Sequence, residues 1–134
     1  MPDLTFVLDD LVRRAGARNA IVLSVDGVLM AADSAFGKDD AEHLAAVAAG
    51  VQSLAKGAAA RFGGDAVKQT LVEMTSANLL VCTAGPGACL AVLAGTGADT
   101  DVGAIAYQMQ MMVAEVAEFV TSPPRPAADG EDPA

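Results

Sequence analysis

The stretch that decides the fold is residues 16–33, with the sequence GARNAIVLSVDGVLMAAD. It contains two short apolar runs, 20–25 and 28–32, on either side of Asp26-Gly27. A DG dipeptide between two apolar runs is a strong signal for a β-hairpin, because a type I′ turn needs a positive φ at both central residues. The sequence therefore predicts a hairpin with a type I′ turn at Asp26-Gly27.

Three segments outside this hairpin have the spacing of helices. Residues 4–12 carry apolar side chains at i, i+3, i+4, i+7 and i+8, and Gly16 can end that helix. Residues 39–62 predict a long helix that begins with a capping box formed by Asp39 and Glu42. Its expected apolar stripe comprises Leu44, Val47, Ala48, Val51, Leu54, Ala55, Ala58 and Phe62. The last helix follows cap candidates at 99–101 and ends near residue 120.

Three more strands are expected between the second and third helices. Residues 67–74 alternate weakly and carry polar side chains, which suits an edge strand. Residues 79–83 and 89–94 are apolar on both sides, so both faces of these strands must be covered. The order α-β-β-α-β-β-β-α predicts an α/β (α+β) fold, in which a five-stranded antiparallel sheet lies inside a three-layer helix–sheet–helix sandwich. The domain spans 1–121, and 122–134 is expected to be a disordered acidic, proline-rich tail.

The charge balance excludes several kinds of partner. The 134 residues include 8 Lys and Arg against 17 Asp and Glu, which gives a net charge of -9. Nucleic acids and anionic membrane surfaces both require a basic face, so neither is an expected partner. The uncharged run 75–98 is broken by Gly85-Pro86-Gly87 and therefore does not predict a membrane span. The N-terminus lacks the basic region of a signal peptide, so a cytoplasmic location is expected.

No catalytic constellation is apparent in the sequence. The only histidine, His43, follows Glu42 early in the long helix and is expected to lie on the surface. No spacing of Cys and His suits a metal, and no motif indicates a cofactor, so the chain is not expected to be an enzyme. With a two-residue loop at 85–86, Cys82 and Cys89 would lie directly opposite each other. They are either a cross-strand redox pair or two buried small apolar residues, and the second interpretation is favoured.

The long helix carries a second stripe, which consists of small residues. Ala46, Gly50, Ser53 and Gly57 are spaced four, three and four apart and would let another helix approach closely. The alternative is that the stripe only reflects an alanine-rich and glycine-rich composition. Arg61 and Met111, which lies off the apolar stripe of the last helix, are candidate contacts for a partner.

Residues 16–33 and the order of elements resemble the roadblock domain family, named for a dynein light chain. Within residues 1–121, the small residue before the first strand, the S-x-D-G turn and the A-x-D exit of the hairpin carry the resemblance. The chain is most similar to the bacterial, GTPase-associated branch, especially the short alanine-rich actinobacterial proteins encoded beside a small Ras-like GTPase and a sensor-kinase-like protein.

The resemblance implies a homodimer that binds a small Ras-like GTPase. The second helices would pack together and the third strands would pair edge to edge. This places Ala46, Gly50, Ser53 and Gly57 near the two-fold axis, and Gln69, Leu71 and Glu73 on the joining edge. Members of the branch that activate GTPases arrange the GTPase's own residues, so no catalytic arginine is assigned here.

Two other functions stay open at this point. One is a small-ligand sensor, which would need a cavity lined by residues such as Val22, Leu90 and Met112. The other is a structural dimeric adaptor that has no effect on nucleotide turnover.

Overall fold

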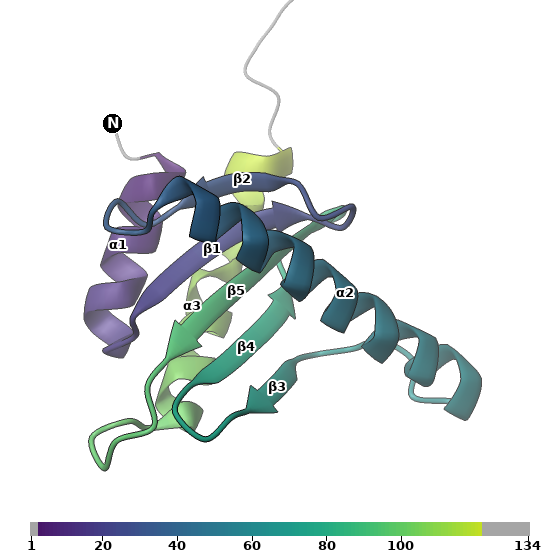
Figure 1. The fold of residues 1–134 in the computed structure, drawn as a ribbon. Coiled ribbons are helices and arrows are strands. Elements are labelled where there is room, and N and C mark those ends of the chain that lie inside the picture. The colour runs from purple at the N-terminus through teal and green to yellow at the C-terminus, as the bar shows by residue number, and fades with distance from the viewer. Residues whose placement is uncertain (1–2, 122–134) are drawn as a thin grey trace, which may run out of the picture.

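The computed structural model describes residues 3–121, in which three helices enclose one sheet (Figure 1). The predicted order of elements and the predicted fold are both confirmed. The elements are α1 (Leu4–Ala15), β1 (Asn19–Ser24), β2 (Leu29–Ala32), α2 (Lys38–Phe62), β3 (Thr70–Glu73), β4 (Asn78–Thr83), β5 (Ala88–Ala94) and α3 (Val102–Thr121). The proposed tail at 122–134 lies outside the described residues.

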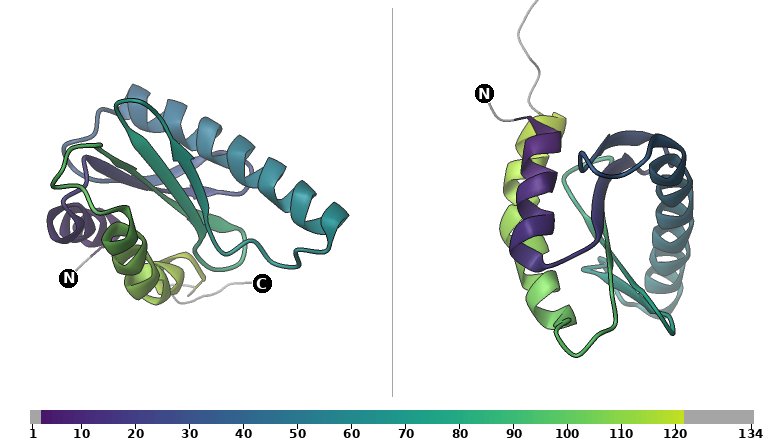
Figure 2. Two further views of the ribbon diagram at one scale, coloured as in Figure 1. Left: turned by 90° about the horizontal axis from the view of Figure 1, so that it is seen from below. Right: turned by 60° about the vertical axis from the view of Figure 1, so that its left-hand side comes forward.

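The sheet is antiparallel throughout and has the strand order β2-β1-β5-β4-β3. β1, β5 and β4 are therefore interior strands, and β2 and β3 are the two edges. α1 and α3 cover one face and α2 covers the other, as Figure 2 shows. The strands that are apolar on both sides are the ones covered on both faces, because a doubly covered strand has no side that water can reach.

Each face of the sheet has its own core. Leu80, Cys82, Leu90 and Val92 point toward α1 and α3, where Val7, Leu8, Leu11, Ile105 and Met109 are buried. Ile21, Leu23, Leu79, Val81 and Cys89 point toward α2. The predicted faces of α1 and α3 are the ones the structure buries. Gly16 ends α1 with a φ of 67°, and Asp101 Oδ1 accepts a hydrogen bond from the Ala104 N–H at the start of α3.

Two predictions about local geometry are wrong. In the β1–β2 turn only Gly27 has a positive φ, 90°, so the turn is not type I′. The Ser24 N–H bonds to the Val28 carbonyl around a three-residue loop, and a bulge between Val22 and Leu23 absorbs the change in register. The N-cap of α2 is Gly37, which makes no side-chain capping bond, so Asp39 and Glu42 form no capping box. Asp39 instead lies in the first turn, where its negative charge interacts favourably with the positive end of the helix dipole.

Candidate protein interface

Strand β3 presents an unpaired edge that the sequence predicts. It pairs with β4 on one side and has no strand on the other among the described residues. Leu71 is 44% exposed, Glu73 is exposed and Gln69, just before the strand, is half-buried. Thr70 and Val72 point the opposite way, toward α2. A row of free N–H and carbonyl groups with an exposed leucine is a template for pairing with another strand.

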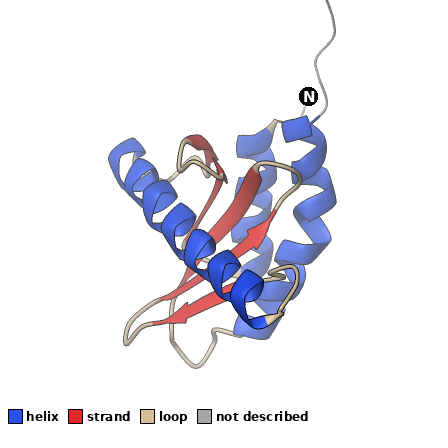
Figure 3. Ribbon diagram, turned by 90° about the vertical axis from the view of Figure 1, so that its right-hand side faces the viewer, coloured by secondary structure: helices blue, strands red, loops and turns tan. Residues whose placement is uncertain are grey.

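The last ten residues of α2, 53–62, include no buried side chain. The buried residues of α2, Ala41, Leu44, Ala45, Ala48 and Gln52, all lie in the first fifteen positions of the helix. Beyond them α2 projects past β3 (Figure 1), and Figure 3 shows this end of the helix in front of the sheet. Leu54 is 78% exposed and Phe62 is 81% exposed on this projecting part. A long helix with a bare apolar half indicates a surface that another protein covers.

The small-residue stripe lies on the side of α2 that faces away from the sheet. Ala46, Gly50, Ser53 and Gly57 are all exposed. A Cβ added at Gly50 or at Gly57 would meet no atom within 4 Å. The structure therefore shows an open strip of backbone, and its contact with a second copy stays a prediction.

The structure does not bring the two candidate contact residues together. Arg61 is exposed in the last turn of α2, and Met111 is 61% exposed on α3. These helices lie on opposite faces of the sheet (Figure 2). One flat partner surface cannot contact both residues of the same chain.

The two cysteines point to opposite faces of the sheet. Three residues, 85–87, separate Ala84 from its hydrogen-bonding partner Ala88, and both Gly85 and Gly87 have a positive φ. This loop is one residue longer than expected, so Cys82 lies opposite Leu90 and Cys89 lies opposite Thr83. A one-residue slip turns a side chain to the other face. The predicted direct opposition is wrong, and the two thiols are the buried apolar residues of the favoured interpretation.

We expect the two thiols to differ in reactivity. Burial, together with a smaller contribution from the nearby Cys89 thiolate, raises the pKa of Cys82 to about 12. Burial also raises the pKa of Cys89, but the Lys56 ammonium lowers it in part. Alkylation at pH 8.5 (roughly the pKa of a free thiol) should label Cys89 before Cys82, and an intrachain disulfide should not form. Peptide mass mapping after timed quenching would show the order, and earlier labelling of Cys82 would contradict it.

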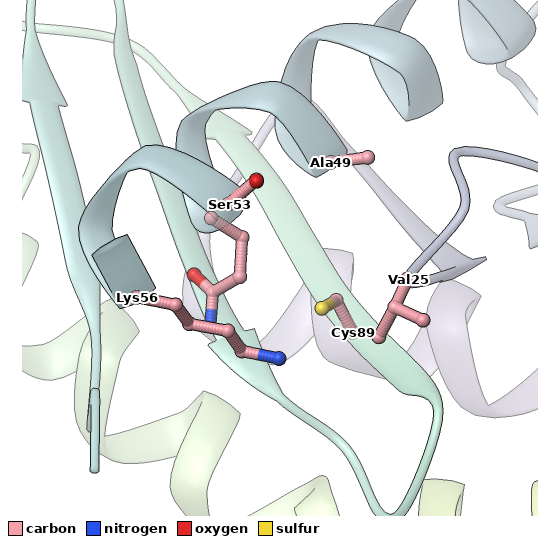
Figure 4. Close-up of a pocket in the computed structure, with 6 residues that line it drawn as sticks. Val25, Ala49, Ser53, Lys56 and Cys89 are labelled. Atoms are coloured by element: carbon pink, nitrogen blue, oxygen red, sulfur yellow. The ribbon is translucent and has the colours of Figure 1, made fainter. Parts of the chain in front are cut away.

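Two hollows lie beside α2, one on each of its flanks. The first, of about 140 Å³, is lined by Val25, Ala49, Gln52, Ser53, Lys56 and Cys89 (Figure 4). The second is an open groove of about 350 Å³, which we call the His43 groove, and it is lined by Arg18, Asn19, Phe36, Asp40, His43, Leu44 and Leu93. The cavity proposed for a ligand sensor is not at its expected place, because Val22, Leu90 and Met112 are packed together in the α1–α3 core.

Two polar residues that sequence patterns do not single out, Gln52 and Arg18, make hydrogen bonds beside the two hollows. Gln52 is only 2% exposed, donates to Thr83 Oγ1 at 3.4 Å and accepts from Thr70 Oγ1 at 3.2 Å. Arg18 Nη2 donates to the Ser76 carbonyl at 2.8 Å, beside the His43 groove. A single glutamine on an alanine-rich helix face gives no periodic signal, which is why sequence patterns miss it.

Within residues 3–121, no three His, Cys, Asp or Glu side chains are grouped to hold a metal ion. None of the helices in this part of the chain has the length and hydropathy needed to cross a bilayer.

Comparisons with known proteins agree with the geometry. A family model described as Roadblock/LC7 domain matches residues 4–94. A Roadblock/LC7 domain from Streptomyces avermitilis superposes with a TM-score of 0.83 at 39% identity, over 90% of this chain and 100% of that chain. Myxococcus xanthus MglB gives 0.77 at 20% identity, over 87% and 94% of the two chains. Acanthamoeba castellanii profilin IB shares the fold, with a TM-score of 0.59 at 16% identity over 86% and 97%. No curated protein matches the sequence.

Proposed function

The chain belongs to the Roadblock/LC7 domain family, and from that premise we propose that it is a homodimeric regulatory or scaffold partner of a small Ras-like GTPase in a bacterial signalling complex. The single observation that best supports this role is the bare surface formed by the edge of β3 and the projecting half of α2. A regulatory protein without chemistry of its own needs surfaces for partners, and this chain has such a surface. A sensor-kinase-like protein is a further proposed partner.

The proposed homodimer forms by pairing β3 of one copy with β3 of the other. Gln69, Leu71 and Glu73 would lie on the joining edge, so that two five-stranded sheets become one. The projecting half of α2 would then extend over the sheet of the second copy. The same apolar side of α2 that covers its own sheet continues to Phe62, which supports this arrangement.

Binding to the GTPase tests the proposal directly. The purified chain is mixed with each small Ras-like GTPase of the same genome, loaded with GDP or with a non-hydrolysable GTP analogue, and the complex is measured by calorimetry. Binding in at least one nucleotide state is expected, and failure in both states would overturn the proposal. Hydrolysis rates with and without the chain then separate an activator from a scaffold.

We predict that Arg61→Ala weakens GTPase binding by about tenfold, which corresponds to roughly 1.4 kcal/mol. Arg61 is exposed at the end of α2, next to the surface proposed for assembly, and arginine is a frequent contributor to binding energy. Arg14→Ala is the matched control, because Arg14 is an exposed arginine on α1, on the other face of the sheet. If Met111→Ala weakens binding and Arg61→Ala does not, the GTPase binds the α1–α3 face instead.

A further inference from the structure

We propose that the chain's own segment 122–134 binds back along the outer side of α3, with its acidic residues between Tyr107 and the two arginines at the end of α1. This surface lies on the face of the sheet opposite α2, so the contact is independent of the proposed homodimer and of GTPase binding. The apolar outer side of α3, the place where the chain leaves α3 and the order of charges along both partners support it.

The outer side of α3 carries an apolar row that no helix or strand of the described residues covers. Tyr107 is 62% exposed, Met111 is 61% exposed and Ala114 is exposed one turn later. At 3.6 residues per turn, intervals of four and three residues place these side chains in one row. α3 buries Ile105 and Met109 on its opposite side. A helix that is apolar on both sides indicates a surface that another segment covers.

The chain leaves α3 at one end of this row. α1 and α3 run antiparallel, with the first turn of α1 beside the last turn of α3 (Figures 2 and 3). α3 has 20 residues and is therefore about 30 Å long. Once residues 122–124 have reversed the direction of the chain, residues 125–134 span about 31 Å at roughly 3.1 Å per residue. The segment is therefore long enough to follow the whole row.

The composition of the segment suits binding to such a surface. It contains no apolar residue larger than proline, so it cannot bury a core of its own. Pro123, Pro124 and Pro126 favour an extended backbone, which loses little conformational entropy when it binds and which packs against aromatic side chains. Phe119, 39% exposed near the end of α3, is such a side chain. The small alanines at 127–128 would let the backbone approach the row closely.

The first charge of the segment complements the last turns of α3. Glu115 and Glu118 are both exposed there, and no residue in the last turn of α3 is basic. Arg125 is the first charged residue after α3. It would lie beside the two glutamates and near the negative end of the helix dipole, where a cation is favourable.

The acidic residues of the segment would reach the basic end of α1. Arg13 and Arg14 lie in the last turn of α1 with side chains 72% and 62% exposed, and they share a single carboxylate, Asp10. At 1.5 Å per residue, Arg13 lies about 14 Å from the first residue of α1, the end that is beside the end of α3. The three carboxylates within 129–132 follow Arg125 by about 12 to 22 Å of extended chain. Opposite charges therefore meet at both ends of the path.

Tyr107 makes this contact measurable in the full chain. It is the single tyrosine of a sequence without tryptophan, so the intrinsic fluorescence reports on this side chain. Acrylamide, which is uncharged, should quench the wild type about twofold less than the variant Arg13→Glu/Arg14→Glu, which repels the acidic residues. Lys56→Glu/Arg61→Glu is the matched control, because it makes the same change of charge on α2 and should leave quenching at the wild-type value.

A charge swap separates loss of the contact from damage to α1. Adding Asp129→Arg/Glu131→Arg/Asp132→Arg to the Arg13→Glu/Arg14→Glu variant should restore the low quenching of the wild type. Equal quenching in the wild type and the Arg13→Glu/Arg14→Glu variant would overturn the proposal, and so would a failure of the swap to restore protection. Neither result bears on GTPase binding, which calorimetry measures separately.

A disulfide shows which copy supplies the segment. Under mild oxidation, Ala114→Cys/Ala128→Cys should form a bond within one chain about tenfold faster than Gly57→Cys/Ala128→Cys, because a disulfide needs Cα atoms within roughly 7 Å. Ala114 and Gly57 are both exposed, and the native cysteines are at most 1% exposed. Non-reducing electrophoresis and peptide mass mapping identify the product. Equal rates for the two variants, or a bond between two chains, would overturn binding of the segment to its own α3.

Discussion

The variant Leu54→Glu should convert the proposed homodimer into a monomer, with a dissociation constant raised by at least about a hundredfold. Leu54 is 78% exposed in the single chain, so the substitution costs the fold little. In the proposed homodimer the projecting part of α2 meets the second copy, and two-fold symmetry uses Leu54 twice. Each buried leucine would contribute roughly 1.5 kcal/mol or more to association. A glutamate in its place would also bring two carboxylates into an apolar seam, where they cannot be solvated.

Gly50→Glu is the matched control for this prediction. It introduces the same charge on the same helix, at a position where an added Cβ meets nothing within 4 Å. Light scattering on both variants over a range of concentrations measures the two dissociation constants. Gly50→Glu should remain a dimer if the contact rests on Leu54 alone, and it should become a monomer if the predicted small-residue stripe lies at the two-fold axis. A monomeric Gly50→Glu beside a dimeric Leu54→Glu would return the contact to the small-residue stripe.

Sequence patterns predict the layers of this fold because the periodicities are strong where burial is one-sided. The row Leu4, Val7, Leu8 and Leu11 permits only one buried face for α1, and the structure buries that face. Ile105, Met109, Met112 and Val116 do the same for α3. The uninterrupted apolar runs of β4 and β5 require cover on both sides. The local pattern of apolar residues is therefore enough to predict elements of this kind.

Turn length and register are less accessible to sequence patterns. The sequence Gly85-Pro86-Gly87 is compatible with a two-residue loop and with a three-residue loop. The choice between them shifts the pairing of β4 and β5 by one residue. In the structure the loop is three residues long, and both of its glycines have a positive φ. The consequence is large, because it moves Cys82 and Cys89 from one face to opposite faces. The free energy of each turn type depends on how the strands that it joins pack. That packing is set by residues that are far away in the sequence.

Sequence patterns also leave undecided which face of α2 meets the sheet. Alanine occupies many positions of this helix, so several faces have similar hydropathy and the pattern does not decide which face meets the sheet. The structure buries Ala41, Ala45 and Ala48 together with Gln52, while Val47 and Leu54 from the expected stripe remain outside. The polar edge of β3 was predictable because charged side chains avoid interior strands. The contact of Gln52 with Thr70, which places α2 over β3, was not predictable from the same pattern.

Asp33→Ala should lower the free energy of unfolding by about 3 kcal/mol. Asp33 is only 3% exposed and lies at the end of the hairpin. Its Oδ1 accepts a hydrogen bond from the Ala20 N–H at 2.8 Å, and both carboxylate oxygens lie 3.3 Å from Asn19 Nδ2. The substitution removes a charge-assisted acceptor and leaves the N–H of Ala20, which is fully buried, without that partner.

Two further variants make this prediction specific to hydrogen bonding at the hairpin. Asp33→Asn keeps an oxygen that can accept from the Ala20 N–H and loses the charge, so it should lower the free energy of unfolding by roughly half as much. Asp26→Ala removes an exposed aspartate from the turn of the same hairpin and should change the value by less than about 0.5 kcal/mol. Urea denaturation at a fixed protein concentration measures all three. Equal losses for Asp33→Ala and Asp26→Ala would mean that the buried carboxylate does not hold β1 to the end of β2, and that the hairpin depends on its apolar runs alone.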